Sequence, residues 1–207
     1  MYLIKTPFWL RGIYPSLTWR KLNDPNTIYI TFDDGPIPNV TPFVLNSLNE
    51  FGAKATFFCI GDNIRKHPNI FDQVRSAGHA IGNHTFNHLK GWDTENEAYL
   101  ENMLKCRELV KSDLFRPPHG RIKYSQISLL RKHVPGLKII MWDVLSGDFD
   151  QSLAPEKCLD NVLRATKPGS IVVFHDSLKA AKRMEYALPR ALRAWSEQGY
   201  RFGTLSD

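Results

Sequence analysis

The sequence has few cysteines and no closely spaced pair of them. The three that it contains are widely separated: Cys59, Cys106 and Cys158. An odd and scattered set argues against a framework of disulfide bonds, and the lack of a CxxC pair argues against a metal site built from thiolates. This cysteine usage is typical of a reducing compartment, so we expect a cytoplasmic protein.

Long hydrophobic runs are also missing. Residues 1–26 hold short apolar pieces, which Lys5, Pro7, Arg11 and Pro15 interrupt. The segment lacks the continuous apolar stretch of a signal peptide, and each of its apolar pieces is too short to span a bilayer. Because the segment mixes aromatic and basic side chains, two interpretations stay open. It packs on the remainder of the fold, which we favour, or it contacts a membrane surface peripherally.

A concentrated patch of charge of one sign is absent as well. The formal net charge is +6, but the basic residues are scattered along the chain. Nucleic-acid recognition needs a basic stripe with stacking aromatics or a known module, and the sequence offers neither. The 43% of hydrophobic and 23% of charged residues are ordinary for a globular chain. A length of 207 residues without repeats or long linkers predicts a single domain. The sequence leaves the oligomeric state open.

What the sequence does contain is an alternation of strand-like and helix-like segments. The expected strands are 27–32, 54–60, 79–83, 114–116, 137–142, 170–174 and 200–204. Helices are expected over 94–111 and 179–198 and from Pro155 onward, and glycines mark the joints between helix and strand at Gly52, Gly78, Gly136, Gly169 and Gly199. Repeated β-then-α order predicts a parallel sheet that curves into a barrel over 27–207, with 1–26 as an extension packed on it.

Polar residues follow several of these strands. Asp33 and Asp34 come directly after the first, His84 after the third, Arg116 ends the fourth and His175 ends the sixth. The carboxyl ends of parallel strands converge on one face of a barrel, where active sites are built. We therefore expect these side chains to meet in space.

The segment TFDDGP sets two carboxylates beside a turn. Asp33 and Asp34 are neighbours, and neighbouring strand residues point in opposite directions, so one can bind a metal while the other handles protons. Taken alone, an Asp-Gly-Pro sequence is more often only a turn.

The segment HTFNH places His84 and His88 four residues apart, a spacing that one helical turn brings to the same side. Two such histidines can also be ordinary surface residues. With a carboxylate from a neighbouring strand end, however, they form a three-ligand set with an open position, as in catalytic zinc sites.

Two further segments carry charged side chains to the same face. Arg116 leads RPPHG and can hold a carboxylate, although a plain salt bridge is an equal alternative. WDVLSGDF supplies Asp143 and Asp148, and VVFHD ends a buried run on His175. A histidine opposite a metal site is suited to proton transfer, although many such residues are only hydrogen-bonded in a core.

The combination TFDDGP, HTFNH, RPPHG, WDVLSGDF and VVFHD resembles the five motifs of the polysaccharide deacetylase family, the NodB-homology domain of carbohydrate esterase family 4. The resemblance implies a distorted (β/α)7 barrel, one divalent ion, usually Zn²⁺ with Co²⁺ or Ni²⁺ as alternatives, and removal of acetyl from an N- or O-acetylated carbohydrate. It implies Asp34, His84 and His88 as the metal ligands. Asp33 is then the base for a metal-bound water, and His175 the acid for the leaving group.

Supporting roles follow from the same resemblance. Arg116 would orient the base and Asp148 the acid. The metal and the backbone N–H of His119 would stabilise the oxyanion, and Phe149, Val173 and Phe174 would shape the pocket for sugar and acyl group. The chain departs from the usual motifs at three positions: His119 replaces a tyrosine, Phe149 a tryptophan and Leu145 a second aspartate. Substrate identity is therefore less firmly implied than the reaction type.

Three other functions were weighed against this one. An inactive sugar-binding or scaffold protein would typically have lost a ligand, the base or the acid, and all are present. A glycosidase needs carboxylates on opposite sides of the scissile bond, which adjacent Asp33 and Asp34 do not provide. The alternative within the family is a deformylase or deacetylase of a lipid-linked amino sugar. The basic surface of the protein would attract the phosphates of such a substrate.

Overall fold

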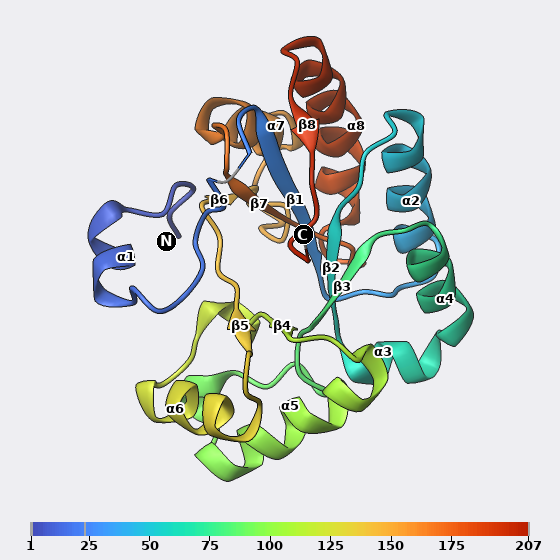
Figure 1. The fold of residues 1–207 in the computed structure, drawn as a ribbon. Helices are drawn as coiled ribbons and strands as arrows, with labels where there is room; N and C mark the ends of the chain where they lie inside the picture. Colours follow the sequence, from blue (N-terminus) through green and yellow to red (C-terminus); the bar gives the residue numbers. More distant parts are fainter. Residues whose placement is uncertain (1, 23, 207) are drawn as a thin grey trace.

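The computed structural model describes residues 2–22 and 24–206, and its centre is a sheet of parallel strands (Figure 1). The strand order is β5-β4-β3-β2-β1-β7-β6, and β8 pairs with the start of β1. The strands are β1 (Thr27–Asp33), β2 (Thr56–Cys59), β3 (Ala80–Asn83), β4 (Leu114–Phe115), β5 (Lys138–Ile139), β6 (Val144–Leu145), β7 (Ile171–His175) and β8 (Arg201–Phe202). The predicted distorted (β/α)7 barrel in one domain is confirmed.

Helices connect the strands and cover the outside of the sheet. They are α1 (Phe8–Ile13), α2 (Val40–Glu50), α3 (Gly61–Lys66), α4 (Pro68–Ser76), α5 (Asn96–Val110), α6 (Tyr124–His133), α7 (Pro155–Ala165) and α8 (Ala181–Glu197), with 3₁₀ turns η1 (Gly91–Asp93) and η2 (Pro118–Gly120). Pro155 occupies the first turn of α7, and the five joint glycines all have positive φ, as expected. No described helix has the length and apolar composition of a membrane span.

Each expected strand overlaps an observed one, but β6 was missed. Its two residues, Val144 and Leu145, pair with Val172 and Val173 of β7. A two-residue strand is too short for any alternation of polar and apolar residues to be visible in sequence. Helix α1 was also missed, because its six residues are too few to show a helical repeat of apolar positions.

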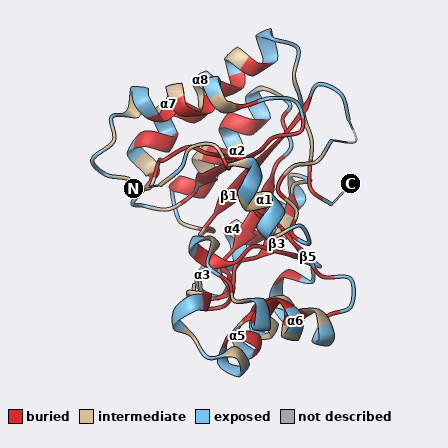
Figure 2. Ribbon diagram, turned by 90° about the vertical axis from the view of Figure 1, so that its left-hand side faces the viewer, coloured by how far each residue is buried: buried red, intermediate tan, exposed pale blue. Residues whose placement is uncertain are grey.

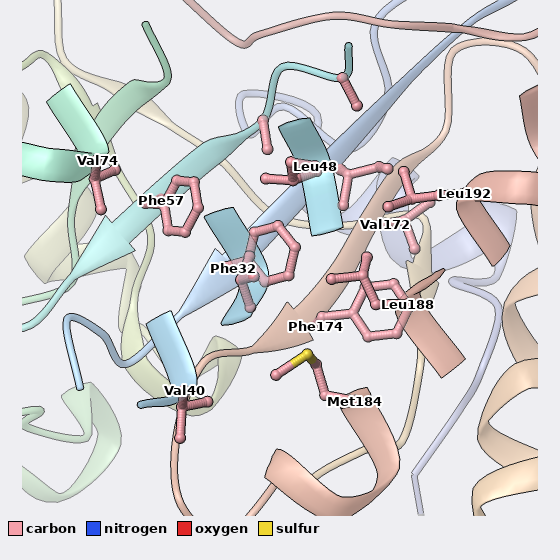
Figure 3. Packing of buried hydrophobic residues seen from close by; sticks show 14 of the residues in the cluster. Phe32, Val40, Leu48, Phe57, Val74, Val172, Phe174, Met184, Leu188 and Leu192 are labelled. Atoms are coloured by element: carbon pink, nitrogen blue, oxygen red, sulfur yellow. The ribbon is translucent and has the colours of Figure 1, made fainter. Parts of the chain in front are cut away.

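The main core lies between the outer face of the sheet and helices α2, α4, α7 and α8. Figure 3 shows Phe32 of β1 and Phe174 of β7 among residues such as Leu188 of α8, and the two rings lie 6.1 Å apart. The opposite face of the same strands carries Tyr29, Phe58 and Ile171, which fill the interior. Figure 2 shows that most strand residues are buried, whereas the helices carry both buried and exposed residues. Alternate residues of a strand therefore pack in different layers: one set contacts the outer helices, and the other set faces the interior of the barrel.

The N-terminal segment lies along the open edge of the barrel, beside β6 in Figure 1. Within the described residues, no ladder joins β5 to β6. Lys5 forms an antiparallel bridge to Val144, and Thr18 forms a parallel bridge to Ile140, just beyond β5. The segment thus spans the gap between β5 and β6, the two edge strands of the sheet.

Asp143 ties this segment to the barrel. Its side chain is fully buried and binds Lys5 Nζ at 2.6 Å, Arg20 Nε at 3.3 Å and the guanidinium of Arg11. Ser170 Oγ donates a further hydrogen bond to Asp143 at 2.6 Å. One buried carboxylate therefore holds three cations that come from residues 5–20. Because it is occupied in this way, Asp143 lies outside the candidate site.

Asp143→Asn is expected to lower the free energy of unfolding by about 2 kcal/mol, because the cations lose their buried counter-charge but remain partly exposed to water. Urea denaturation with an unchanged m-value would measure the loss. Asp160→Asn is the matched control, since its partners Lys157 and Arg164 lie at the surface, and little change is expected there. Equal midpoints for Asp143→Asn and the parent would contradict the anchoring role.

Candidate functional site

The carboxyl ends of the strands bring the predicted polar residues together. Asp33 is the last residue of β1 and His175 the last of β7, and these two strands pair in that register. His84 directly follows β3, and Arg116 directly follows β4. The expectation that these positions converge on one face is met in the structure, since neighbouring parallel strands end at the same edge.

Asp34, His84 and His88 form a cluster with the geometry of a metal site. One ligand atom from each lies within 4.8 Å of the other two. Asp34 Oδ1 is 3.3 Å from His88 Nε2 and 3.8 Å from His84 Nε2. The same oxygen is buried and has no hydrogen-bond partner. A buried carboxylate oxygen without a donor requires an explanation, and a cation between the three ligands provides one. The residues present therefore fit a divalent ion.

His84 is prepared for this role by its surroundings. Its Nδ1 lies 2.8 Å from the backbone oxygen of Arg116. Since a carbonyl only accepts, Nδ1 must donate the proton, and Nε2 keeps its lone pair towards Asp34. Burial, with a smaller contribution from the nearby His88, holds the pKa of His84 well below its ordinary value. The ring is therefore neutral at physiological pH, which is the form that binds a metal.

The two histidines are brought together by a loop rather than by the expected helical turn. Thr85 and His88 have φ values of 62° and 57°, and the rings of His84 and His88 lie 5.1 Å apart. Asn83 holds the loop, accepting a hydrogen bond from Thr85 N at 2.8 Å and donating one to a carbonyl of α5 at 2.8 Å. Asp34 also has a positive φ, 87°. Backbone of this kind persists where the surroundings hold it, and it is common at functional sites.

Asp33 is held by a buried guanidinium. Arg116 Nη1 donates to Asp33 Oδ1 at 2.7 Å, and the arginine side chain is fully buried. Thr31 Oγ1 accepts a second hydrogen bond from Nη1 at 2.7 Å, and the guanidinium lies 4.1 Å above the ring of Phe58. Arg116 thus makes a buried pair with a carboxylate, and the alternative of a surface salt bridge is ruled out.

His175 is paired with Asp148 on the other side of β1. Asp148 Oδ1 lies 2.7 Å from His175 Nδ1, and Asp148 Oδ2 accepts a hydrogen bond from His175 N at 2.7 Å. Burial by itself lowers the pKa of His175, but the charge and hydrogen bond of Asp148 outweigh it and raise the pKa to about 10. The imidazole is consequently protonated near neutral pH and can donate a proton.

The predicted pocket residues are divided between the site and the core. The ring of His119 lies 4.7 Å from that of His88, and the ring of Phe149 lies 5.4 Å from that of His175. Val173 points to the same side of β7 as His175, two residues away. Phe174 requires a correction, because it packs against α8 in the main core (Figure 3). Adjacent strand residues face opposite sides, so Phe174 cannot share the pocket with Val173.

Asp176 was not identified from the sequence. It accepts hydrogen bonds from Gly35 N at 3.0 Å and from Thr41 Oγ1 at 2.6 Å, and so fixes the turn that follows Asp34. A side chain at Gly35 would collide with it, since a Cβ there would lie 1.9 Å from Asp176 Oδ2. Burial raises the pKa of Asp176 to about 8. Its place beside His175 at the end of an apolar run was the available signal.

Known proteins resemble this chain over most of its length. The family model described as polysaccharide deacetylase matches residues 20–134. A peptidoglycan-N-acetylglucosamine deacetylase of Bacillus cereus is 35% identical over 197 residues, covering 92% of each chain. A chitooligosaccharide deacetylase of Azorhizobium caulinodans is 36% identical over 190 residues, covering 87% of this chain and 84% of the relative. A crystal structure of a peptidoglycan N-acetylglucosamine deacetylase superposes with a TM-score of 0.86 at 29% identity, covering 97% of this chain and 95% of the other.

Proposed function

Because this chain belongs to the polysaccharide deacetylase family, we propose that it is a metal-dependent hydrolase that removes acetyl groups from N-acetylated amino sugars. The observation that carries the proposal is the unsatisfied, buried Asp34 Oδ1 between two imidazole nitrogens. Beside it lie the carboxylate of Asp33, which Arg116 holds, and the imidazole of His175, which is paired with Asp148. Relatives named for peptidoglycan and chitooligosaccharides support a carbohydrate substrate. O-acetylated sugars share the acyl chemistry and are a second substrate class.

In this proposal Asp34, His84 and His88 hold one divalent ion, and the mixture of nitrogen and carboxylate ligands favours Zn²⁺, with Co²⁺ or Ni²⁺ as alternatives. When bound, the ion acts as a Lewis acid that lowers the pKa of a water ligand and polarises the acyl carbonyl. Neutral imidazole at His84 suits this binding without loss of a proton.

In this proposal Asp33 and His175 transfer the protons of the reaction. Asp33, fixed by Arg116, takes a proton from the attacking water as its oxygen bonds to the acyl carbon. His175, held by Asp148, gives a proton to the sugar nitrogen as the carbon–nitrogen bond breaks. The products are acetate and a free amino sugar. We further propose that the backbone N–H of His119 stabilises the oxyanion and that Phe149 and Val173 line the pocket.

The direct test is mass-spectrometric detection of acyl loss. The panel holds N-acetylglucosamine oligomers, peptidoglycan fragments, sugar nucleotides and lipid-linked amino sugars, each acetylated or formylated. We expect acetate release from the acetylated oligomers, loss of activity on chelation and recovery with Zn²⁺. Selective release of formate from a lipid-linked sugar would favour the deformylase alternative. Sugar binding without turnover would favour an inactive protein, and activity that survives chelation would contradict a metal-dependent mechanism. The cellular location and any membrane contact stay predictions.

Asp148→Asn is expected to move the alkaline limb of the kcat/KM profile to lower pH. His175 acts in its protonated form, so activity falls as pH rises through its pKa. Because Asp148 is what raises that pKa, its neutralisation should lower the limb by about 1–3 pH units. The measurement is kcat/KM across neutral to alkaline pH on an N-acetylated substrate. Asp160→Asn, which removes a surface carboxylate of α7 paired with Lys157 and Arg164, is the control. An unmoved limb in Asp148→Asn would show that the acid is another group.

A further inference from the structure

The loop of residues 147–150 contacts His175 through two of its side chains. Asp148 binds the imidazole Nδ1, and the ring of Phe149 stands edge-on to the imidazole at an interplanar angle of 74°. Gly147, which begins the loop, has a φ of 82°. The position of His175 relative to a substrate therefore depends on whatever holds this loop in place.

One support of the loop comes from the opposite end of the chain. The ring of Tyr2 lies 4.9 Å from that of Phe149, and Tyr2 Oη donates a hydrogen bond to Asp150 Oδ2 at 3.0 Å. Tyr2 also covers Gly147, where an added Cβ would lie 2.9 Å from Tyr2 Oη. A single side chain thus contacts three of the four loop residues. Arg183 of α8 also supports the loop, since its Nε donates to the backbone oxygen of Asp148 at 2.6 Å.

Tyr2 is itself held by the residues that follow it. Leu145 N donates to Ile4 O at 2.8 Å, and Thr6 N donates to Asp143 O at 2.9 Å, and these hydrogen bonds form the isolated antiparallel bridge between Lys5 and Val144 of β6. The salt bridge between Lys5 and buried Asp143 adds to this contact. A continuous set of contacts therefore runs from Asp143 through residues 4–6 and Tyr2 to the loop.

We propose that Tyr2 is a positioning residue for the deacetylation reaction, acting through Phe149 and the loop 147–150 to hold His175 where it protonates the leaving group. The proposal rests on the proposed function, with His175 as the acid. Tyr2 and residues 4–6 then help to position the acid, whereas the remainder of the N-terminal segment, α1 included, only closes the barrel edge. Tyr2 has no contact with the metal ligands, so its effect is confined to the proton-donating side of the site.

The test compares two kinds of leaving group. Tyr2→Ala should lower kcat on an N-acetylglucosamine oligomer about 5-fold with KM unchanged, a size in the range for loss of an aromatic pair. On 4-nitrophenyl acetate, whose phenolate leaves without being protonated, the same variant should match the parent. Tyr2→Phe keeps the ring and should restore kcat to within about 2-fold. Phe8→Ala, which removes an exposed aromatic of α1 from the same segment, is the matched control and should change neither reaction.

Hydrogen exchange provides a measurement that does not require turnover. The amides of residues 147–150 should exchange faster in Tyr2→Ala than in Phe8→Ala, with equal melting temperatures. Equal loss on both substrates would indicate a merely structural effect and overturn the proposal. An unchanged kcat on the oligomer together with unchanged exchange would overturn it as well. If the parent releases no acetate at all, the proposed function fails, and the exchange rates still decide whether Tyr2 holds the loop.

Discussion

Asp33→Asn is expected to retain the metal and to lose a factor of about 10²–10⁴ in kcat, the usual cost of removing a general base. The amide keeps an oxygen that can accept the 2.7 Å hydrogen bond from Arg116 Nη1, so the buried guanidinium keeps this hydrogen bond although it loses its counter-charge. It cannot accept a proton from the attacking water. The measurements are the turnover number on an N-acetylglucosamine oligomer and the metal content by elemental analysis.

Two comparisons make the Asp33→Asn result specific. Asp34→Asn should instead weaken metal binding, because Asp34 Oδ1 is the atom that lies between the two imidazoles. Asp93→Asn removes an exposed carboxylate from the loop after β3 and should leave both quantities near those of the parent. A kcat for Asp33→Asn within a few-fold of the parent would mean that another group is the base.

His84→Ala is expected to abolish both metal binding and turnover. The variant removes one of three protein ligands and also the hydrogen bond that Nδ1 makes to Arg116 O. Loss of a residue that merely orients a ligand already costs about 10–100-fold in affinity, so loss of the ligand itself should exceed about 100-fold. Competition against a chromophoric chelator measures the affinity directly and does not depend on activity.

His133→Ala is the control for that experiment. His133 is exposed on α6 with its Nδ1 near a carbonyl of the same helix, and its removal should leave about one metal ion per chain. Equal metal contents in His84→Ala and the parent would remove Asp34, His84 and His88 as the site. Activity without metal in the parent would separately exclude the proposed chemistry.

Several parts of the site could be predicted because they depend on local sequence. Asp33, Arg116 and His175 each lie at the end of an apolar run, and a parallel sheet necessarily brings such ends to one edge. The pairing of His84 with His88 was visible from their spacing. The conformation that pairs them was not, because the positive φ of Thr85 depends on Asn83 and on contacts with α5.

Other features required contacts between distant parts of the chain. The sequence placed Phe174 in the pocket, but the helix packed on the outer face of β7 decides which alternate residues face outward. Asp143 and Asp148 look equivalent in the segment WDVLSGDF. The family resemblance implied that Asp148 orients His175, and the structure has this pair. That Asp143 instead neutralises cations of the N-terminal segment is shown only by the fold.

The sequence by itself therefore determined the alternation of strands and helices apart from short elements such as β6 and α1, the face on which the polar residues meet and the residue types available for metal binding and proton transfer. The tertiary structure decided which atoms meet: the buried Asp34 Oδ1 between two imidazoles, the raised pKa of His175 beside Asp148, and Tyr2 against Phe149. The physical reason is the distance along the chain over which each kind of interaction acts. Strand alternation and turn chemistry act over a few neighbouring residues, whereas burial and pairing of charges depend on residues as far apart as Tyr2 and Asp150, which only the completed barrel brings into contact.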